Sequence, residues 1–459
     1  MSKETSNGPS RGATRAYVLV PWLKSAEHDA RKAGRAIRSQ EARLEEAVGL
    51  AAAIHLDIVG TSVVQLVEIK PSTLIGEGKV EELKGLFAEQ EVELVIVDGH
   101  LSPVQQRNLE KAWSLKILDR TGLILEIFGE RANTKEGALQ VELAHLNYQK
   151  SRLVRSWTHL ERQRGGFGFL GGPGETQIEA DRRVIQERIA KIEKQLESVK
   201  RTRELHRKTR REVPYPIVAL VGYTNAGKST MFNRLTEADV FAENLLFATL
   251  DPTMRAVKLP SGRKIILSDT VGFISDLPTH LVAAFRATLE EVLEAEIVLH
   301  VRDAAHEESD IQKADVESVL TSLGLIGPKV KDPPRPLIEV MNKIDALDVE
   351  HHDAIVNAAS REAMTVATSA LTGEGVDELL ALIDTHVIDE GTPITFDLLP
   401  SEGEALAWLY ENGQVRQRDT TDDGMVTLEV VLPDAEIGRL EKRFPKIASR
   451  HTLPERIVD

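Results

Sequence analysis

The sequence lacks cysteine, and it also lacks any apolar run of the length, about 18 residues, that a transmembrane helix needs. Without cysteine the chain can form no disulfide and no thiolate metal site, which fits a reducing, cytoplasmic location. The first 15 residues are polar and contain no apolar core of a secretory signal. We therefore expect a disordered leader at 1–15 and no membrane insertion.

The charge of the chain is unevenly distributed. A formal net charge of −15 argues against a protein that coats nucleic acid over its whole surface. Residues 150–212, however, carry 17 lysines and arginines against 9 acidic residues, a local net charge of +8 that leaves −23 on the remainder. Such a segment is either a nucleic-acid contact or a solvated helical face.

The strongest motif is PIVALVGYTNAGKST, at residues 216–230. Its apolar start, Ile217–Val221, is typical of a buried strand, and G-x-x-x-x-G-K-S and a helical pattern follow. In this context the backbone N–H groups of the loop and the helix N-terminus surround phosphates. We therefore assign nucleotide binding to Gly222, Tyr223, Asn225, Ala226, Gly227, Lys228, Ser229 and Thr230.

Two residues of this loop and one downstream threonine are expected to act on phosphate and Mg²⁺. Lys228 would reach the β/γ-phosphates, and Ser229 would offer its hydroxyl to Mg²⁺. In LLFATLDPT, residues 245–253, a mobile loop would supply a threonine to Mg²⁺ and the γ-phosphate. We choose Thr249, and Thr253 is the alternative.

The sequence DTVG supplies the next part. A strand at Lys264–Leu267 precedes it, so Asp269 is placed to hold Mg²⁺ through water and Gly272 to direct its amide to the γ-phosphate. Because that amide contact needs a γ-phosphate, the following loop can respond to the nucleotide state. The predicted metal ligands are Ser229, Thr249 and Asp269, and the predicted catalytic residues are Lys228, Thr249 and Gly272.

Selectivity for guanine is predicted from NKID, which follows a strand at Ile338–Met341. The Asp345 carboxylate can accept hydrogen bonds from both N1–H and the exocyclic amine of guanine, a pair that adenine does not offer. Asn342 would brace the site, and the Lys343 stem would lie along the base. A backbone N–H for guanine O6 is expected from the loop residues Ser369, Ala370 and Leu371.

Between residues 136 and 212 the pattern predicts a helical hairpin. Two apolar seams of coiled-coil spacing flank a glycine-rich breaker at 165–175, GGFGFLGGPGE. Such a hairpin has no globular core of its own and is expected to form an arm. Guanidinium groups and unburied rings near its tip suit folded RNA, or else they solubilise the hairpin and pack on its seam. The candidate RNA contacts are Arg152, Arg155, Arg162, Arg164, Phe167, Phe169, Arg182 and Arg183.

These motifs resemble those of the HflX family of ribosome-associated, translation-factor-class P-loop GTPases. The resemblance lies in GYTNAGKST, LFATLDPT, DTVGFI, RTGLILEIF at 120–128 and GGPGETQ at 171–177, and it covers nearly the whole chain from about residue 16. It implies binding of GTP or GDP with Mg²⁺, and GTP hydrolysis. It also implies binding to the large (50S) ribosomal subunit or the 70S particle, with the arm toward rRNA, and the splitting or rescue of stalled ribosomes.

The expected fold class is α/β, with three parts. Alternating strand and helix patterns at 16–135 predict a small α/β domain with a parallel sheet, which carries the arm at 136–212. The GTPase domain, a mostly parallel sheet with helices on both faces, is expected at 213–388. A small α+β domain of pattern βαββα is expected at 392–459. Residues 75–83, IGEGKVEEL, are either a βα turn or an anion site, and we favour the turn.

Two residues bear on the mechanism. Phe273 stands directly after the DxxG glycine, where many GTPases carry a glutamine that orients water, so we expect slow intrinsic hydrolysis that ribosomes stimulate. The resemblance implies that an apolar residue is normal there. Asn225 either braces its loop or, as in similar GTPases, admits K⁺ as an additional cofactor.

Two other functions compete with a ribosome factor: a GTPase of rRNA or tRNA maturation or large-subunit assembly, and a non-catalytic RNA-binding scaffold. The paired seams of the arm can satisfy one another within one chain, so we expect a monomer.

Overall fold

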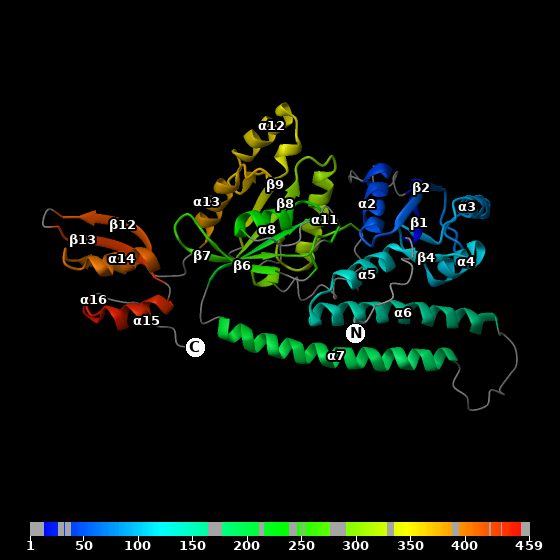
Figure 1. Ribbon diagram of the computed structural model, residues 1–459, viewed down its shortest axis with the longest axis horizontal. Helices are drawn as coiled ribbons and strands as arrows, with labels where there is room; N and C mark the ends of the chain where they lie inside the picture. Colours follow the sequence, from blue (N-terminus) through cyan, green and yellow to red (C-terminus); the bar gives the residue numbers. More distant parts are fainter. Residues whose placement is uncertain are drawn as a thin grey trace, which may run out of the picture.

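The computed structural model describes residues 13–25, 32, 38–163, 177–210, 215–237, 246–247, 249–250, 253–275, 291–327, 335–387, 394–421, 424–432 and 434–450. These residues form two parallel or mostly parallel sheets, a pair of long helices and a smaller antiparallel sheet (Figure 1). The expected α/β fold class is therefore confirmed. In the described part of the chain, no helix has the length and apolarity needed to span a bilayer.

The N-terminal sheet is entirely parallel, with strand order β2-β1-β3-β4. Alternate residues of β1 face opposite sides, because side chains in a strand alternate. Ala16, Val18 and Val20 therefore meet α2 and α5, whereas Tyr17 and Leu19 meet α3 and α4. The elements are β1 Arg15–Leu23, α2 Gln40–Ala52, β2 Asp57–Leu66, α3 Glu77–Glu89, β3 Leu94–Val97, α4 Pro103–Trp113, β4 Lys116–Asp119 and α5 Arg120–Arg131.

The second sheet has six strands in the order β10-β9-β8-β5-β7-β6, and only β6 is antiparallel to its neighbour. Helices α8 and α13 cover one face and α11 lies on the other (Figure 1). The elements are β5 Ile217–Gly222, α8 Lys228–Thr236, β6 Thr253–Lys258, β7 Lys264–Asp269, β8 Ile297–Asp303, α11 Ser309–Ser322, β9 Leu337–Asn342, η2 Ile344–Ala346, α12 Val349–Ala359, β10 Thr365–Ala367 and α13 Val376–His386.

One continuous apolar cluster joins the two sheets. It contains residues of α2 and α5 from the N-terminal part, Ala219 and Val221 of β5, and the downstream residues Phe247 and Phe273. The Phe128 ring of α5 meets the Phe247 ring edge to face at 4.9 Å between centroids. The N-terminal domain therefore packs directly against the segments that follow the phosphate loop.

The predicted hairpin consists of α6 Lys135–Gln163 and α7 Gln177–Arg210, which run side by side (Figure 1). Buried Ile189 and Ile192 belong to the predicted seam of α7, and Arg188 of α7 pairs with Glu142 of α6 at 2.6 Å. One expectation changes, because α6 is not a free arm along its whole length. Val141 and Ala144 are buried in the cluster that includes α5, so the first half of α6 is anchored on the N-terminal domain.

The C-terminal part has its own core and the predicted βαββα order. Its three strands pair antiparallel in the order β11-β13-β12, and Phe396 and Leu428 are fully buried between this sheet and the helices. The elements are β11 Ile394–Leu398, α14 Gly403–Asn412, β12 Gln414–Thr420, β13 Val426–Val431, α15 Asp434–Arg443 and α16 Pro445–Ala448.

Replacing Phe128 by alanine should lower the free energy of unfolding by about 3–5 kcal/mol, because it opens a cavity in the cluster that joins the two sheets. The measurement is urea unfolding followed by circular dichroism. Val67→Ala is the control: Val67 is 87% exposed, so this variant should remain within about 0.5 kcal/mol of the parent. Equal changes in the two variants would contradict the shared core.

Candidate functional site

The predicted phosphate loop connects β5 to α8 and depends on two glycines. A Cβ on Gly222 would lie 2.2 Å from the Val301 carbonyl oxygen, and one on Gly227 would lie 2.2 Å from Asn342 Nδ2. Both glycines have positive φ, +153° and +93°, which side chains rarely adopt. The loop can therefore approach its neighbours, and a ligand, as bare backbone. Asn225 is exposed and has φ 60°.

Lys228 begins α8 and is buried, with 6% of its surface exposed. Its Nζ donates a hydrogen bond to the Tyr223 carbonyl oxygen at 2.8 Å, across the mouth of the loop. Burial lowers the pKa of this amine to about 8, against the opposing attraction of Asp269. A phosphate beside Nζ would favour the charged form, so the position suits an anionic ligand.

The three predicted metal ligands lie together. The Ser229 hydroxyl donates to Asp269 Oδ2 at 2.7 Å, the Thr249 hydroxyl donates to the same oxygen at 2.9 Å, and the two hydroxyls are 2.8 Å apart. The other carboxylate oxygen, Asp269 Oδ1, is buried and has no hydrogen-bond partner. Burial raises the pKa of Asp269, although Lys228 opposes this shift. Oxygen donors with an unsatisfied buried carboxylate oxygen fit Mg²⁺.

The absence of a larger cluster of metal-binding side chains in the described part of the chain does not argue against Mg²⁺ at this site. Among the described residues there is no group of three or more histidine, cysteine or acidic side chains that could hold a metal ion. Mg²⁺ in a phosphate-loop protein requires no such group, because it keeps waters and binds substrate phosphates.

The DTVG segment is hydrogen-bonded directly to the phosphate loop. The Phe273 N–H donates to the Gly222 carbonyl at 3.0 Å, and the Thr224 N–H donates to the Phe273 carbonyl at 2.8 Å. A Cβ on Gly272 would lie 2.8 Å from Thr224 Cα and 3.0 Å from Lys228 Nζ, so only glycine fits there. The Phe273 side chain is 3% exposed and lies in the apolar cluster, and it has no group that could hydrogen-bond to a water.

The NKID segment braces the phosphate loop from the neighbouring strand. Asn342 Nδ2 donates to the Ala226 carbonyl at 2.9 Å, and Asn342 Oδ1 accepts from the Ala370 N–H at 2.9 Å. One buried amide thus links three segments. The Ala370 N–H is therefore hydrogen-bonded within the protein, to the side chain of the NKID asparagine.

The remaining predicted base contacts lie around the same edge. Asp345 is exposed, and its Oδ1 accepts from the Ser369 hydroxyl at 2.6 Å. Lys343 has φ 66°, and its Nζ pairs with Asp303 at 2.7 Å, so its stem runs across the surface beside the loop. Leu371 is 69% exposed next to them, and Thr230 lies in the first turn of α8.

The sequence did not predict what the Tyr223 side chain does. Its backbone belongs to the phosphate loop, but its hydroxyl lies in a buried polar cluster with Arg38, Glu46 and Ser275. These residues come from separate segments with no shared motif. One more member lies in a segment singled out from the sequence: RTGLILEIF, a mark of the family resemblance, begins α5, and its Arg120 reaches the same cluster.

The predicted RNA contacts on the arm divide into three groups. Arg152 holds α6 to the N-terminal domain: its guanidinium pairs with fully buried Asp119 at 2.6 Å. The same group lies over the Tyr148 ring and contacts Gln106. Arg164, Phe167 and Phe169 lie outside the described residues, as do the side chains of Arg155 and Arg162.

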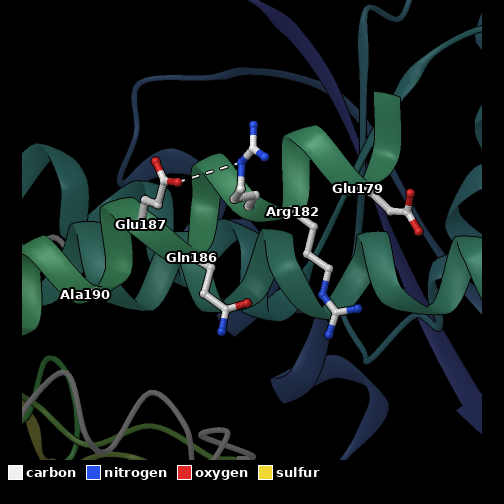
Figure 2. A pocket seen from close by; sticks show the side chains of 6 residues that line it. Glu179, Arg182, Gln186, Glu187 and Ala190 are labelled. Atoms are coloured by element: carbon white, nitrogen blue, oxygen red, sulfur yellow. Dashed lines mark ion pairs between the residues drawn. The ribbon is translucent and has the colours of Figure 1, made fainter. Parts of the chain in front are cut away.

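Arg182 and Arg183 are exposed on α7. They line a shallow hollow whose other residues are Glu179, Gln186, Glu187 and Ala190 (Figure 2). Figure 2 shows the Arg182 side chain directed away from the helix, and the dashed line marks the ion pair of Arg183 with Glu187 at 3.8 Å.

Comparison with protein families gives four matches that together cover most of the chain. They are GTP-binding GTPase N-terminal over residues 41–129, GTP-binding GTPase Middle Region over 131–210, 50S ribosome-binding GTPase over 217–343, and HflX C-terminal domain over 354–452.

Individual proteins match over similar lengths. GTPase HflX of Magnetococcus marinus is 50% identical over 87% of this chain and 90% of its own length, and that of Escherichia coli is 44% identical over 82% and 86%. A solved GTP-binding protein of Sulfolobus solfataricus in complex with GDP has 24% identity and a TM-score of 0.42, covering 81% of this chain and 98% of its own. On the family matches and the identity to these relatives, the chain belongs to the HflX family of GTPases.

Proposed function

We propose that this protein is a Mg²⁺-dependent GTPase that binds the large ribosomal subunit through its helical arm and dissociates or rescues stalled ribosomes. The observation that carries the enzymatic part is the cluster of Ser229, Thr249 and Asp269 beside buried Lys228. Three hard oxygen donors and one ammonium group within a single loop system suit a metal-bound triphosphate.

In this proposal the loop Gly222–Thr230 and Gly272 hold the phosphates, while Asp345 selects the base. When bound, Mg²⁺ would neutralise charge that develops on the β- and γ-phosphate oxygens. The chain's own part is to fix geometry in advance, because Asn342 links the loop to the base-binding edge through two hydrogen bonds. Phe273 supplies no hydrogen-bonding group for water, so the free protein should hydrolyse GTP slowly.

The arm is the proposed ribosome-binding element. It has a basic composition on an otherwise acidic protein, and Arg182 and Arg183 are exposed on its second helix near the end that leads to the tip. Guanidinium groups at such positions suit the phosphates of folded RNA. Arg152 is left out of this surface, since it holds the arm to its own domain.

Asp345→Asn should weaken GTP affinity by at least about 100-fold and favour xanthosine triphosphate. The reason is hydrogen-bond matching: a carboxylate accepts from guanine N1–H and the exocyclic amine, whereas an amide can donate to the carbonyl that xanthine has there. Binding would be measured with fluorescent nucleotide analogues. The parent protein with xanthosine triphosphate is the control, and unchanged base preference in the variant would remove Asp345 from the base site.

GTP hydrolysis should rise on the order of 10- to 1,000-fold with large ribosomal subunits and remain near the basal rate with small subunits, because an RNA or protein surface must complete the site that Phe273 leaves incomplete. Hydrolysis would be measured alone and with each subunit. Stimulation by large-subunit precursors rather than mature subunits would favour the assembly alternative. No turnover at all would favour a non-catalytic scaffold.

The same assay in K⁺ and Na⁺ buffers decides between the two roles of Asn225. A rate that depends on K⁺ and loses this dependence in Asn225→Ala means that the loop admits the ion. Equal rates in both salts mean that Asn225 only braces the loop.

Reversing two charges on the arm, with Arg182→Glu and Arg183→Glu together, should weaken large-subunit binding by about 10-fold or more and reduce its salt dependence. Basal GTP hydrolysis should not change. Arg201→Glu is the matched control, because Arg201 is an exposed arginine of the same helix, farther along the chain from the tip, whose side chain pairs with Glu197. Binding would be measured by cosedimentation, and equal losses in both variants would mean a general charge effect.

A further inference from the structure

A buried polar cluster lies where the N-terminal domain meets the phosphate loop. Its members, each with less than a tenth of its surface exposed, are Arg38, Glu46, Asp98, Arg120, Tyr223 and Glu308. The charges of the cluster balance, because its three carboxylates pair with three arginines. Two of the arginines are the buried members, and the third is the partly buried Arg43. Buried charges require such pairing, and a group that loses its partner carries a large penalty.

The Tyr223 hydroxyl is the point at which this cluster reaches the nucleotide loop. It accepts hydrogen bonds from Arg38 Nη1 at 3.0 Å and from the Ser275 N–H at 2.9 Å, and it donates to Glu46. A hydroxyl has one proton and two lone pairs, so its capacity is complete. Burial next to Glu46 raises the pKa of this hydroxyl, which therefore keeps its donor proton.

Ser275 is the second contact of the cluster with the nucleotide site, since it directly follows DTVGFI, residues 269–274. Arg120 Nη2 donates to the Ser275 carbonyl at 2.9 Å, and Arg120 also pairs with Glu46 and Asp98, each at 2.5 Å. The segment that would respond to the γ-phosphate is thus held by a side chain of the N-terminal domain.

Arg120 is the first residue of α5, and the residue before it faces the arm. The Asp119 carboxylate caps α5 through the Gly122 N–H at 2.9 Å, and it accepts a hydrogen bond from the Tyr148 hydroxyl at 2.6 Å and the ion pair of Arg152 at 2.6 Å. Both partners belong to α6. At this junction of β4 and α5, Arg120 contacts the switch segment and the adjacent Asp119 contacts the arm.

We propose that Asp119 and Arg120 are positioning residues that couple the nucleotide site to the arm. In this proposal, replacing GDP by GTP changes the position of α6, and of α7 packed on it, relative to the N-terminal domain. The path runs from Tyr223 and Ser275 through Arg120 to Asp119, and from there to Tyr148 and Arg152. Its biological meaning rests on the proposed function, but the coupling itself concerns this chain alone. Because binding linkage is reciprocal, RNA on the arm must alter nucleotide affinity by the same factor.

The test changes one hydroxyl at each end of the path. Tyr223→Phe removes the contact with Ser275, and Tyr148→Phe removes the contact with Asp119 while keeping the ring under Arg152. The readout is the ratio of dissociation constants for GDP and a non-hydrolysable GTP analogue, measured without ribosomes. Tyr148→Phe should change this ratio by about 2- to 30-fold although it lies outside the nucleotide site. The matched control, Glu142→Gln, breaks an ion pair within the arm and should leave the ratio unchanged.

The double variant separates coupling from two independent defects. If the path is shared, the combined change is smaller than the product of the single changes; if the changes multiply, the proposal is wrong. It is equally wrong if Tyr148→Phe behaves as Glu142→Gln does. Hydrogen exchange gives a second measurement that needs no variant at the arm: α6 amides near Tyr148 should differ in protection between the GDP and GTP-analogue states, and Tyr223→Phe should remove this difference. A parent protein that hydrolyses GTP and responds to large subunits but shows none of these effects would keep its proposed function and lose the coupling.

Discussion

The arrangement of this protein depends on the Tyr223 hydroxyl and the charged groups around it. This one side chain leaves the phosphate loop, enters the N-terminal domain and uses its full hydrogen-bonding capacity there. Removing one partner of a buried, paired charge typically costs about 3–5 kcal/mol, so the cluster tolerates only a narrow set of relative positions for its members. Around it, the apolar contacts of α5 with Phe247 and Phe273 stabilise the interface, but the hydrophobic effect does not depend on the orientation of the groups. The polar cluster therefore sets the geometry of the interface, and the apolar cluster stabilises it.

The nucleotide site depends on two features: glycines that let its segments approach closely, and an asparagine that holds two of its loops together by hydrogen bonds. Gly222, Gly227 and Gly272 are glycines because neighbouring backbone or side-chain atoms occupy the space of a Cβ. Asn342 then links the phosphate loop to the loop of Ala370 through one buried amide. The exception is the position after DTVG, where Phe273 is part of the interface rather than of the chemistry.

The arm is attached to the N-terminal domain through its first helix, α6. Val141 and Ala144 pack α6 on the N-terminal domain, and Tyr148 and Arg152 fix the same helix to Asp119. The second helix packs on this anchored half: Arg188 of α7 pairs with Glu142 of α6, and the neighbouring seam residues Ile189 and Ile192 are buried. Both apolar packing and a buried ion pair therefore fix α6 to the N-terminal domain.

The sequence by itself determined the local parts: the strand, loop and helix around GYTNAGKST, the order of the GTPase motifs, the parallel N-terminal sheet, the βαββα pattern and the two helices of the arm. Each is encoded by spacing and residue type over a short window, so composition and periodicity were sufficient. Only the tertiary structure decided that Tyr223 faces the N-terminal domain, that Arg152 pairs with Asp119 instead of lying on the exposed arm surface, and that Ser275, Glu46 and Arg120 meet. These contacts join residues between 33 and 229 positions apart, and no local pattern specifies them, because they form only when separate elements pack against one another in the folded chain.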